Sequence, residues 1–139
     1  MIQDEIMFHG HQNVRSNHPR TIEVTRHENL TLRGDCIIGV RANKACSTLK
    51  ENLKNRLRIE DSVVTMEIIV GNDSCRIDGS GSGQLTLEHA HDVVLRKSSF
   101  VCPRTISVRC DKGSNEIPRK IISGLQNPET VALLRITVE

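Results

Sequence analysis

The sequence is almost without aromatic residues. Only Phe8 and Phe100 are aromatic among its 139 residues, and neither tryptophan nor tyrosine occurs. Proteins that bind single-stranded nucleic acid by stacking its bases need aromatic side chains, so the composition argues against that class. The core must instead consist of isoleucine, valine and leucine. A chain of this length can bury roughly 68% of the surface that it exposes when unfolded, which is enough for one sizeable core.

Long apolar runs are also absent. No stretch reaches the roughly 18 apolar residues of a membrane-spanning helix, so we expect no membrane partner. The first residues, MIQDEIMFHGHQ, carry acids and lack the basic start and apolar stretch of a signal peptide. The net charge is only +2, with a pI of about 8.4, which neither requires nor rules out nucleic acid. We expect a cytoplasmic protein.

The five cysteines form no CxxC motif. They are odd in number and scattered, at Cys36, Cys46, Cys75, Cys102 and Cys110. A disulfide framework or a cysteine zinc site is therefore not expected, and a reducing compartment is the simpler interpretation. Cys36 or Cys102 could act as a nucleophile if a neighbouring base lowered its pKa, but free cysteines are more often small buried apolar residues.

An internal repeat is present. VRANKACSTLKENL, from Val40, returns altered as VRCDKGSNEIPRKI, from Val108. Segments 40–70 and 108–138 align without a gap, and seven of the 31 pairs are identical, against about two expected by chance. We expect a single domain, residues 1–139, made of two repeats at about 1–71 and 72–139, with the boundary in the polar segment GNDSCRIDGSGSGQ, residues 71–84.

Each repeat predicts the order β-β-α-β, and an extra strand before each repeat is left open. Short β-branched runs predict the strands, and apolar residues spaced by four predict the helices. The expected strands are 21–25, 36–41 and 62–70 in the first repeat and 92–96, 105–110 and 130–138 in the second, and the helices are 48–57 and 116–125. IQDEIMFHG, after Met1, predicts an additional strand, and Gly39 indicates a bulge or a close approach of another segment.

The fold class that follows is mainly β with two short helices. Neither repeat could bury its apolar strands alone, so we expect the halves to interleave about a pseudo-two-fold axis. A closed or nearly closed barrel of six to eight strands would also remove exposed sheet edges. An α+β sandwich is the alternative.

Several segments resemble a known family. GHQNV, HPRTIEVT, RGDCIIGVRANKAC and FVCPRTISVRCDK are similar to an archaeal family described as a domain of unknown function, number 371. The matching positions are His11, Asn13, His18, Gly34, Asp35, Cys36, Lys44, Cys102, Arg104, Thr105 and Lys112. The resemblance spans nearly the full chain and implies an archaeal cytoplasmic protein of β-barrel type without an established activity. The chain departs from the family pattern at Gln12, where a proline is usual, and in GSGSGQ, where the family is richer in histidine and proline.

Three histidines are candidate metal ligands. His9 and His11 have the spacing that points two side chains to one side of a strand, and His18 follows closely. Our hypothesis is that these three hold a divalent cation near Asp35. The alternative is that they are solvated or capping histidines at loop edges, which HxH patterns more often are.

Two cations recur at equivalent positions of the repeats. They are Arg41 and Lys44 in the first and Arg109 and Lys112 in the second. Because each pair precedes an expected helix N-terminus, it could form an anion site, with Asn13 as a further ligand-binding candidate. The alternative is that the arginines point outward and that Asn43 and Asp111 merely shape the turn.

Two functions follow from these candidates. The first is a protein that binds an anionic ligand, either a phosphate-containing small molecule or nucleic acid, at polar loops near the pseudo-two-fold axis. The second is a hydrolase or nuclease acting on phosphodiesters, possible with or without a metal. Its catalytic residues would be His11, His18, Asp35 and Arg104, assisted by Lys44 and Lys112. An enzyme should gather these side chains in one concave pocket. We favour binding because no complete catalytic motif occurs. The sequence does not decide whether the protein is an enzyme or what its oligomeric state is.

Overall fold

The first of two β-sheets contains the longest strands. The computed structural model describes all of residues 1–139. This sheet is antiparallel and has the order β1 (Ile2–His9), β8 (Val131–Val138), β4 (Val63–Val70) and β5 (Asp73–Ser80). Its inner face is apolar because every second residue is buried, as in β8, where the even-numbered residues 132–138 are buried and the odd-numbered ones are exposed or half-buried.

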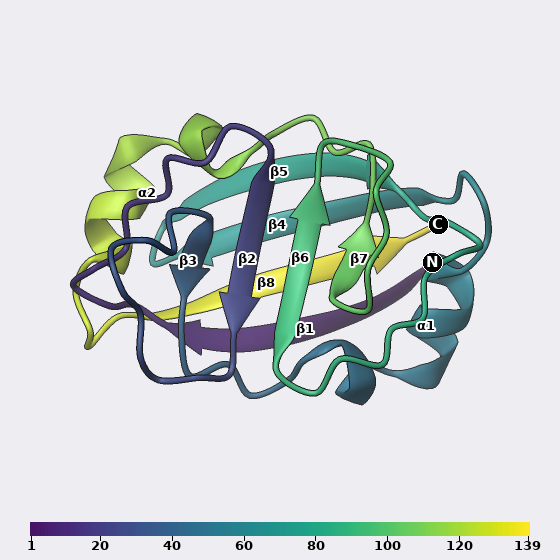
Figure 1. The fold of residues 1–139 in the computed structure, drawn as a ribbon, viewed down its shortest axis with the longest axis horizontal. Helices are drawn as coiled ribbons and strands as arrows, with labels where there is room; N and C mark the ends of the chain where they lie inside the picture. Colours follow the sequence, from purple (N-terminus) through teal and green to yellow (C-terminus); the bar gives the residue numbers. More distant parts are fainter.

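The second sheet lies across the first and has shorter strands (Figure 1). Its order is β3 (Ile37–Gly39), β2 (Thr21–Thr25), β6 (Asp92–Arg96) and β7 (Thr105–Ser107). β2 and β6 run antiparallel at its centre, and each pairs in parallel with one short outer strand. Almost every residue of β2 and β6 is buried.

The two helices lie at opposite ends of the molecule (Figure 1). They are α1 (Glu51–Leu57) and α2 (Arg119–Leu125), and each follows a single 3₁₀ turn, η1 (Cys46–Thr48) or η2 (Ser114–Glu116). The apolar stripe that predicted them is buried throughout, at Leu49, Leu53, Leu57, Ile117, Ile121 and Leu125. The helices begin about three residues later than expected, after Lys50 and Pro118. Neither helix is long and apolar enough to span a membrane.

The prediction of a mainly β protein with two helices is confirmed, but the closed barrel is wrong. The strands form two separate four-stranded sheets, which are joined only by isolated bridges, His9 to Val40 and Ser80 to Val108. Pairing stops there because the next residues, Arg41 and Arg109, have φ values of +52° and +50°, which turn the chain out of the strand. Short outer strands that end in such a turn cannot close a barrel.

The sequence left open an extra strand before each repeat but did not locate the one before the second repeat, which is β5. It occupies part of segment 71–84, which was interpreted as the boundary loop between the repeats. Its sequence DSCRIDGS is mostly polar, and only Cys75 and Ile77 face the core. A tight turn at Gly71, with φ +60°, pairs β5 with β4, so tertiary pairing outweighs a weak local strand preference.

The two halves of the chain have the same order of elements and equivalent backbone hydrogen bonds. The orders are β1-β2-β3-α1-β4 and β5-β6-β7-α2-β8. Gly10 N–H donates to Thr130 O (3.0 Å), and Gly81 N–H donates to Ser62 O (2.9 Å). The same bonds would result from a duplicated unit, and on this ground we propose that the repeat arose by duplication.

Gly39 marks a close approach of β1. A Cβ atom built on Gly39 would lie 2.0 Å from Cδ2 of Phe8, whose ring is fully buried. We therefore expect Gly39→Ala to lower the free energy of unfolding by about 1–3 kcal/mol through overpacking. Gly83→Ala is the matched control, since its Cβ would meet only Arg58 O at 3.7 Å. Urea unfolding should separate the two variants, and equal stabilities would contradict the packing role of Gly39.

Candidate functional site

The residues Asn43 and Asp111 shape the backbone. Asn43 Oδ1 accepts the Met7 N–H at 2.9 Å, and Asp111 Oδ1 accepts the Asp78 N–H at 3.0 Å. In return the Asn43 N–H donates to Met7 O and the Asp111 N–H to Asp78 O, both at 2.9 Å. Asn43 thereby extends strand-like pairing onto β1, and Asp111 extends it onto β5. Both residues thus have the role of shaping the turn, which was the alternative to an anion site.

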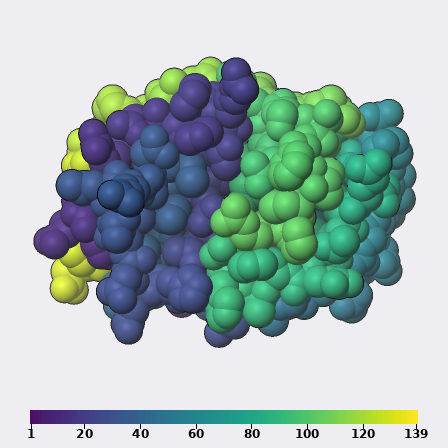
Figure 2. Space-filling view, viewed as in Figure 1, coloured from purple at the N-terminus to yellow at the C-terminus, as the bar shows by residue number.

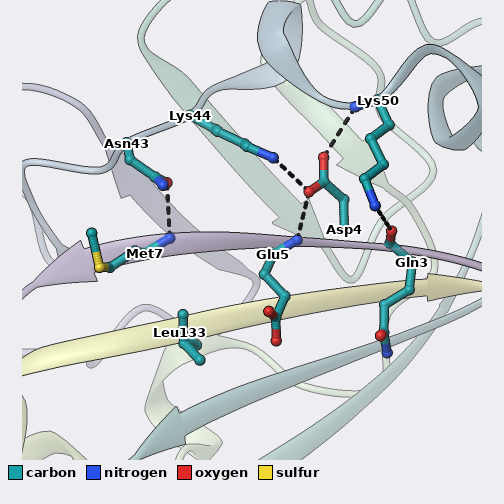
Figure 3. A pocket seen from close by; sticks show the side chains of 8 residues that line it. All are labelled: Gln3, Asp4, Glu5, Met7, Asn43, Lys44, Lys50 and Leu133. Atoms are coloured by element: carbon teal, nitrogen blue, oxygen red, sulfur yellow. Dashed lines mark hydrogen bonds and ion pairs between the residues drawn. The ribbon is translucent and has the colours of Figure 1, made fainter.

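Lys44 makes an ion pair with a buried carboxylate. Its Nζ lies 2.6 Å from Oδ1 of Asp4, a β1 residue that is only 4% exposed (Figure 3). Asp4 also accepts the backbone N–H groups of Glu5 and Lys50, at 2.8 and 3.0 Å. Although burial opposes ionisation, these hydrogen bonds hold the pKa of Asp4 below its ordinary value.

The surrounding depression is therefore a poor anion site. It is lined by Gln3, Asp4, Glu5, Met7, Asn43, Lys44, Lys50 and Leu133 (Figure 3). Of its two lysines, Lys44 pairs with Asp4, and Lys50 Nζ donates to Gln3 O at 3.0 Å. Lys112, which is equivalent to Lys44 in the second repeat, also has a protein partner, since its Nζ donates to Arg76 O at 2.8 Å. Both predicted ligand-binding lysines thus have protein partners.

The structure does not bring His9, His11 and His18 together. Nδ1 of His11 accepts the Asn13 N–H at 3.0 Å, Nδ1 of His18 accepts the Arg20 N–H at 3.1 Å, and Nδ1 of His9 lies 3.3 Å from Arg41 O. Each ring thus lies against a nearby backbone group, and no group of three or more His, Cys, Asp or Glu side chains could hold a metal ion.

The other predicted catalytic residues are also dispersed. Among the pockets of the molecule, one contains His11 and another contains Lys44, but none contains His18, Asp35 or Lys112. Asp35 and His18 meet only through their backbone carbonyls, which lie 3.4 and 3.1 Å from the Ser114 hydroxyl. Asn13 fastens a loop by donating from Nδ2 to Leu30 O at 2.7 Å. The enzyme hypothesis therefore lacks an assembled catalytic pocket.

A different set of cations does converge, at one end of the β2–β6 pair. We call it the anion pocket, and it is lined by Arg26, His27, Glu28, Arg41 and His91. The Arg26 N–H donates to His91 O at 2.8 Å, and the Arg41 N–H donates to His27 O at 2.9 Å. The imidazole rings of His27 and His91 lie 4.6 Å apart. Backbone hydrogen bonds between three segments thus bring two arginines and two histidines into one pocket, whose single carboxylate is that of Glu28.

Only Arg41 of this pocket was predicted as a site residue. Arg26, His27 and His91 were missed because they lie in loops, where a histidine or arginine carries no local signal. Arg41 was proposed because it recurs in the repeat, and its guanidinium donates from Nη2 to Pro128 O at 3.0 Å. His11 lines an adjoining depression, which shares Glu28 and Arg41 with the anion pocket.

A second cationic depression lies at the other end of the same strand pair. It is lined by Pro19, Arg20, Lys97 and Ser98. There the Lys97 N–H donates to Arg20 O at 2.9 Å, as the Arg26 N–H does to His91 O. Figure 2 shows the two halves of the chain side by side on this face, in purple to blue and in green. The five residues of β2 lie between Arg20 and Arg26, which are therefore about 20 Å apart.

Next to the anion pocket, two carboxylates are buried around Arg104. This acid pocket is lined by Glu23, Thr25, His27, Glu28, Asn29, Ile37 and Asp92. Nη1 of Arg104 lies 3.0 Å from Glu23 Oε1 and 3.3 Å from Asp92 Oδ2. Burial, together with repulsion by Asp92, raises the pKa of Glu23 to about 7. Arg104 was predicted from sequence, but neither acid was, although an acid inside the apolar run TIEVT is a recognisable signal.

One thiol adjoins this cluster. Nη2 of Arg96 lies 3.2 Å from Cys102 Sγ, and the Thr105 hydroxyl lies 3.5 Å from it. Although burial opposes ionisation, these hydrogen bonds lower the pKa of Cys102 to about 7. Burial instead raises the pKa of Cys36 to about 11 and that of Cys46 to about 12. Of the two predicted candidates, Cys102 is therefore the more acidic thiol.

Comparison with known proteins gives two matches. The family model described as "Domain of unknown function (DUF371)" matches residues 6–139. Uncharacterized protein MJ0206 of the archaeon Methanocaldococcus jannaschii is 38% identical over 117 residues, which cover 84% of this chain and 86% of that protein.

We expect Lys44→Met to lower the free energy of unfolding by about 1–3 kcal/mol, because it leaves Asp4 charged, buried and without its cation. The matched control is Lys112→Met, which should change stability by less than about 0.5 kcal/mol. Because the pKa of Asp4 is depressed, the difference between Lys44→Met and the wild type should shrink as the pH falls below the ordinary value of 3.8. Urea unfolding measures this stability difference, and a difference that does not depend on pH would contradict the ion pair.

The raised pKa of Glu23 predicts a pH dependence of opposite sign. The folded state keeps a proton that the unfolded chain releases, so this stabilisation is complete below the ordinary pKa of 4.5 and is lost as the pH rises through about 7. Between about pH 5 and about pH 8, the wild type should lose about 2 kcal/mol or slightly more of unfolding free energy relative to Glu23→Gln. Parallel stability curves for the two proteins would refute the raised pKa.

Proposed function

This chain belongs to the family described as domain of unknown function DUF371, as its sequence segments indicated. We propose that it binds a phosphate-containing anionic ligand at the anion pocket. The observation that carries the proposal is the convergence of Arg26, His27, Arg41 and His91 on one depression that contains a single carboxylate. Guanidinium groups are well suited to phosphate because their planar donors match its oxygens.

The pairing of charges distinguishes this pocket from its counterparts. Arg109, which is equivalent to Arg41, lies 2.7 Å from Asp61 Oδ1, and Lys97, in the second cationic depression, lies 2.8 Å from Glu116 Oε1. Arg41 instead donates to the neutral carbonyl of Pro128, and Arg26 makes no ion pair. The anion pocket therefore contains two arginines that make no ion pair with the protein.

The backbone at Arg41 supports the same choice. A left-handed conformation costs a residue with a side chain about 1 kcal/mol, and here it directs the chain away from β3 and places Arg41 against His27. Arg109 has the same conformation, so the turn belongs to the scaffold. Of these two equivalent arginines, only Arg41 lacks an acidic partner.

A hydrolase is the less favoured function. His11 borders the depression beside the anion pocket, but His18 and Asp35 lie outside every pocket, and Arg104 is engaged by Glu23 and Asp92. His27, His91 and Glu28 lie beside Arg26 and Arg41, but no serine, threonine or cysteine lines that pocket, and it contains none of the residues His11, His18, Asp35 and Arg104. We therefore propose binding, with the phosphate group as the feature recognised.

Inorganic pyrophosphate is a direct probe, measured by isothermal titration calorimetry at low salt. Arg41→Asn keeps a residue that tolerates positive φ, and it should weaken binding about 10-fold because one charge-assisted interaction is lost. Arg109→Asn is the matched control, which has the same backbone geometry and a guanidinium already paired with Asp61. It should leave the affinity unchanged. Equal effects of the two substitutions, or no binding by the wild type, would contradict the proposal.

A further inference from the structure

The anion pocket and the acid pocket are neighbouring parts of one surface. They share His27 and Glu28 in their walls, and both open beside the β2–β6 pair. The first presents cationic donors, whereas the second presents two buried carboxyl groups around Arg104. A ligand that extends across the shared wall would therefore meet opposite chemistry at its two ends.

Asp92 has an acceptor that the protein leaves unused. The residue is only 9% exposed, and its Oδ2 lies 3.3 Å from the Arg104 guanidinium. Its Oδ1 is buried and has no hydrogen-bond partner. A buried carboxylate oxygen without a donor is unfavourable, so this atom calls for an N–H or O–H group from outside the protein. Because Asp92 lines the acid pocket, a ligand in that pocket could supply it.

Glu23 supplies the complementary group. Its side chain is 8% exposed and lies across Arg104 from Asp92. Because burial favours its neutral form, the carboxyl can donate a hydrogen bond near neutral pH while Asp92 accepts one. Asn29 adds an amide, and Ile37 adds an apolar wall. Glu23 and Asp92 are diagonal neighbours on one face of the β2–β6 pair, since Glu23 lies opposite Val94 and Thr25 opposite Asp92. A donor and an acceptor at such neighbouring positions match the edge of a nucleobase on which an amino group adjoins a ring nitrogen.

A second cation would fit this pocket poorly. Arg104 already contributes one positive charge between Glu23 and Asp92, and an alkylammonium group would be repelled by it. A neutral amino group satisfies Asp92 Oδ1 without adding charge. Among phosphate-bearing molecules, nucleotides with an amino group on the base combine these features.

We infer that the acid pocket receives the amino-bearing base of a nucleotide whose phosphate occupies the anion pocket. The inference rests on the proposed phosphate binding and names the class of ligand for the same site. The nucleotide could be a free mononucleotide or the end of a nucleic-acid strand, since both present the same phosphate and base.

Paired nucleotides test the inference without changing the protein. AMP carries an amino group on its base where IMP carries an oxo group, and CMP differs from UMP in the same way. By isothermal titration calorimetry the wild type should bind AMP at least about 10-fold more tightly than IMP, and CMP more tightly than UMP by a similar factor. In the pose of the amino base, the oxo group of IMP or UMP faces Asp92 Oδ1 and offers it no hydrogen, while the ring N–H faces the Glu23 carboxyl in place of an acceptor. Short oligoadenylates, compared with AMP, distinguish a strand end from a free mononucleotide, and either source agrees with the inference.

Asp92→Asn locates the preference. It should abolish the discrimination between AMP and IMP, while pyrophosphate binding, which uses Arg26 and Arg41, stays within about 2-fold of the wild type. Arg41→Asn should instead weaken AMP and IMP by the same factor. Retained pyrophosphate binding also shows that Asp92→Asn is folded, and the wild-type comparison of AMP with IMP does not depend on any variant.

The outcomes separate the two proposals. If pyrophosphate binds and AMP and IMP bind equally, the base pocket is refuted and phosphate binding stands. If neither pyrophosphate nor any nucleotide binds, both proposals fail. If AMP is preferred but Asp92→Asn leaves the preference intact, the amino group is recognised elsewhere and the role of the acid pocket is refuted.

Discussion

The antiparallel pairing of β2 with β6 is the constraint on which the candidate sites depend. It joins the two halves of the chain at the centre of the second sheet, with Glu23 opposite Val94 and Thr25 opposite Asp92. The hydrogen bond from Arg26 to His91 continues this pairing beyond one end of the strands. Both pockets are therefore built from residues of the two halves, and neither would exist in one half alone.

The same pairing creates a local imbalance of charge. Burial of Glu23 and Asp92 concentrates acid beneath Arg104, while Arg26 and Arg41 stand beside them without carboxylate partners. Because the interior screens charge poorly, opposite charges arranged in this way can orient a ligand that has an anionic and a neutral polar end. The second half, where Arg109 and Lys97 are paired with acids, lacks this imbalance.

Local sequence predicts some features of this protein well and others poorly. The stripe of Leu49, Leu53 and Leu57 predicts its helical segment because helical spacing alone produces an apolar face. β5 escapes prediction because only two of its residues face the core, and the hairpin with β4 decides its conformation. The closed barrel was wrong for a related reason, since whether short strands continue to pair depends on the backbone at Arg41 and Arg109.

The site residues show the same division. Recurrence in the repeat selected Arg41 and Lys44 equally, but Asp4 engages Lys44, whereas Arg41 keeps its charge unpaired. Nothing in the order of residues reveals that Glu23, Asp92 and Arg104 meet, because their contacts span up to 81 positions of the chain.

The family, the mainly β composition, the two helices and the recurring positions can be read from the amino-acid sequence, because they follow from local spacing and identity. Which charges are paired, which carboxylates are buried and which loops share a wall became known from the folded structure. Those properties depend on distances across the fold, and a carboxylate or guanidinium acquires its chemistry from the groups that the fold places around it.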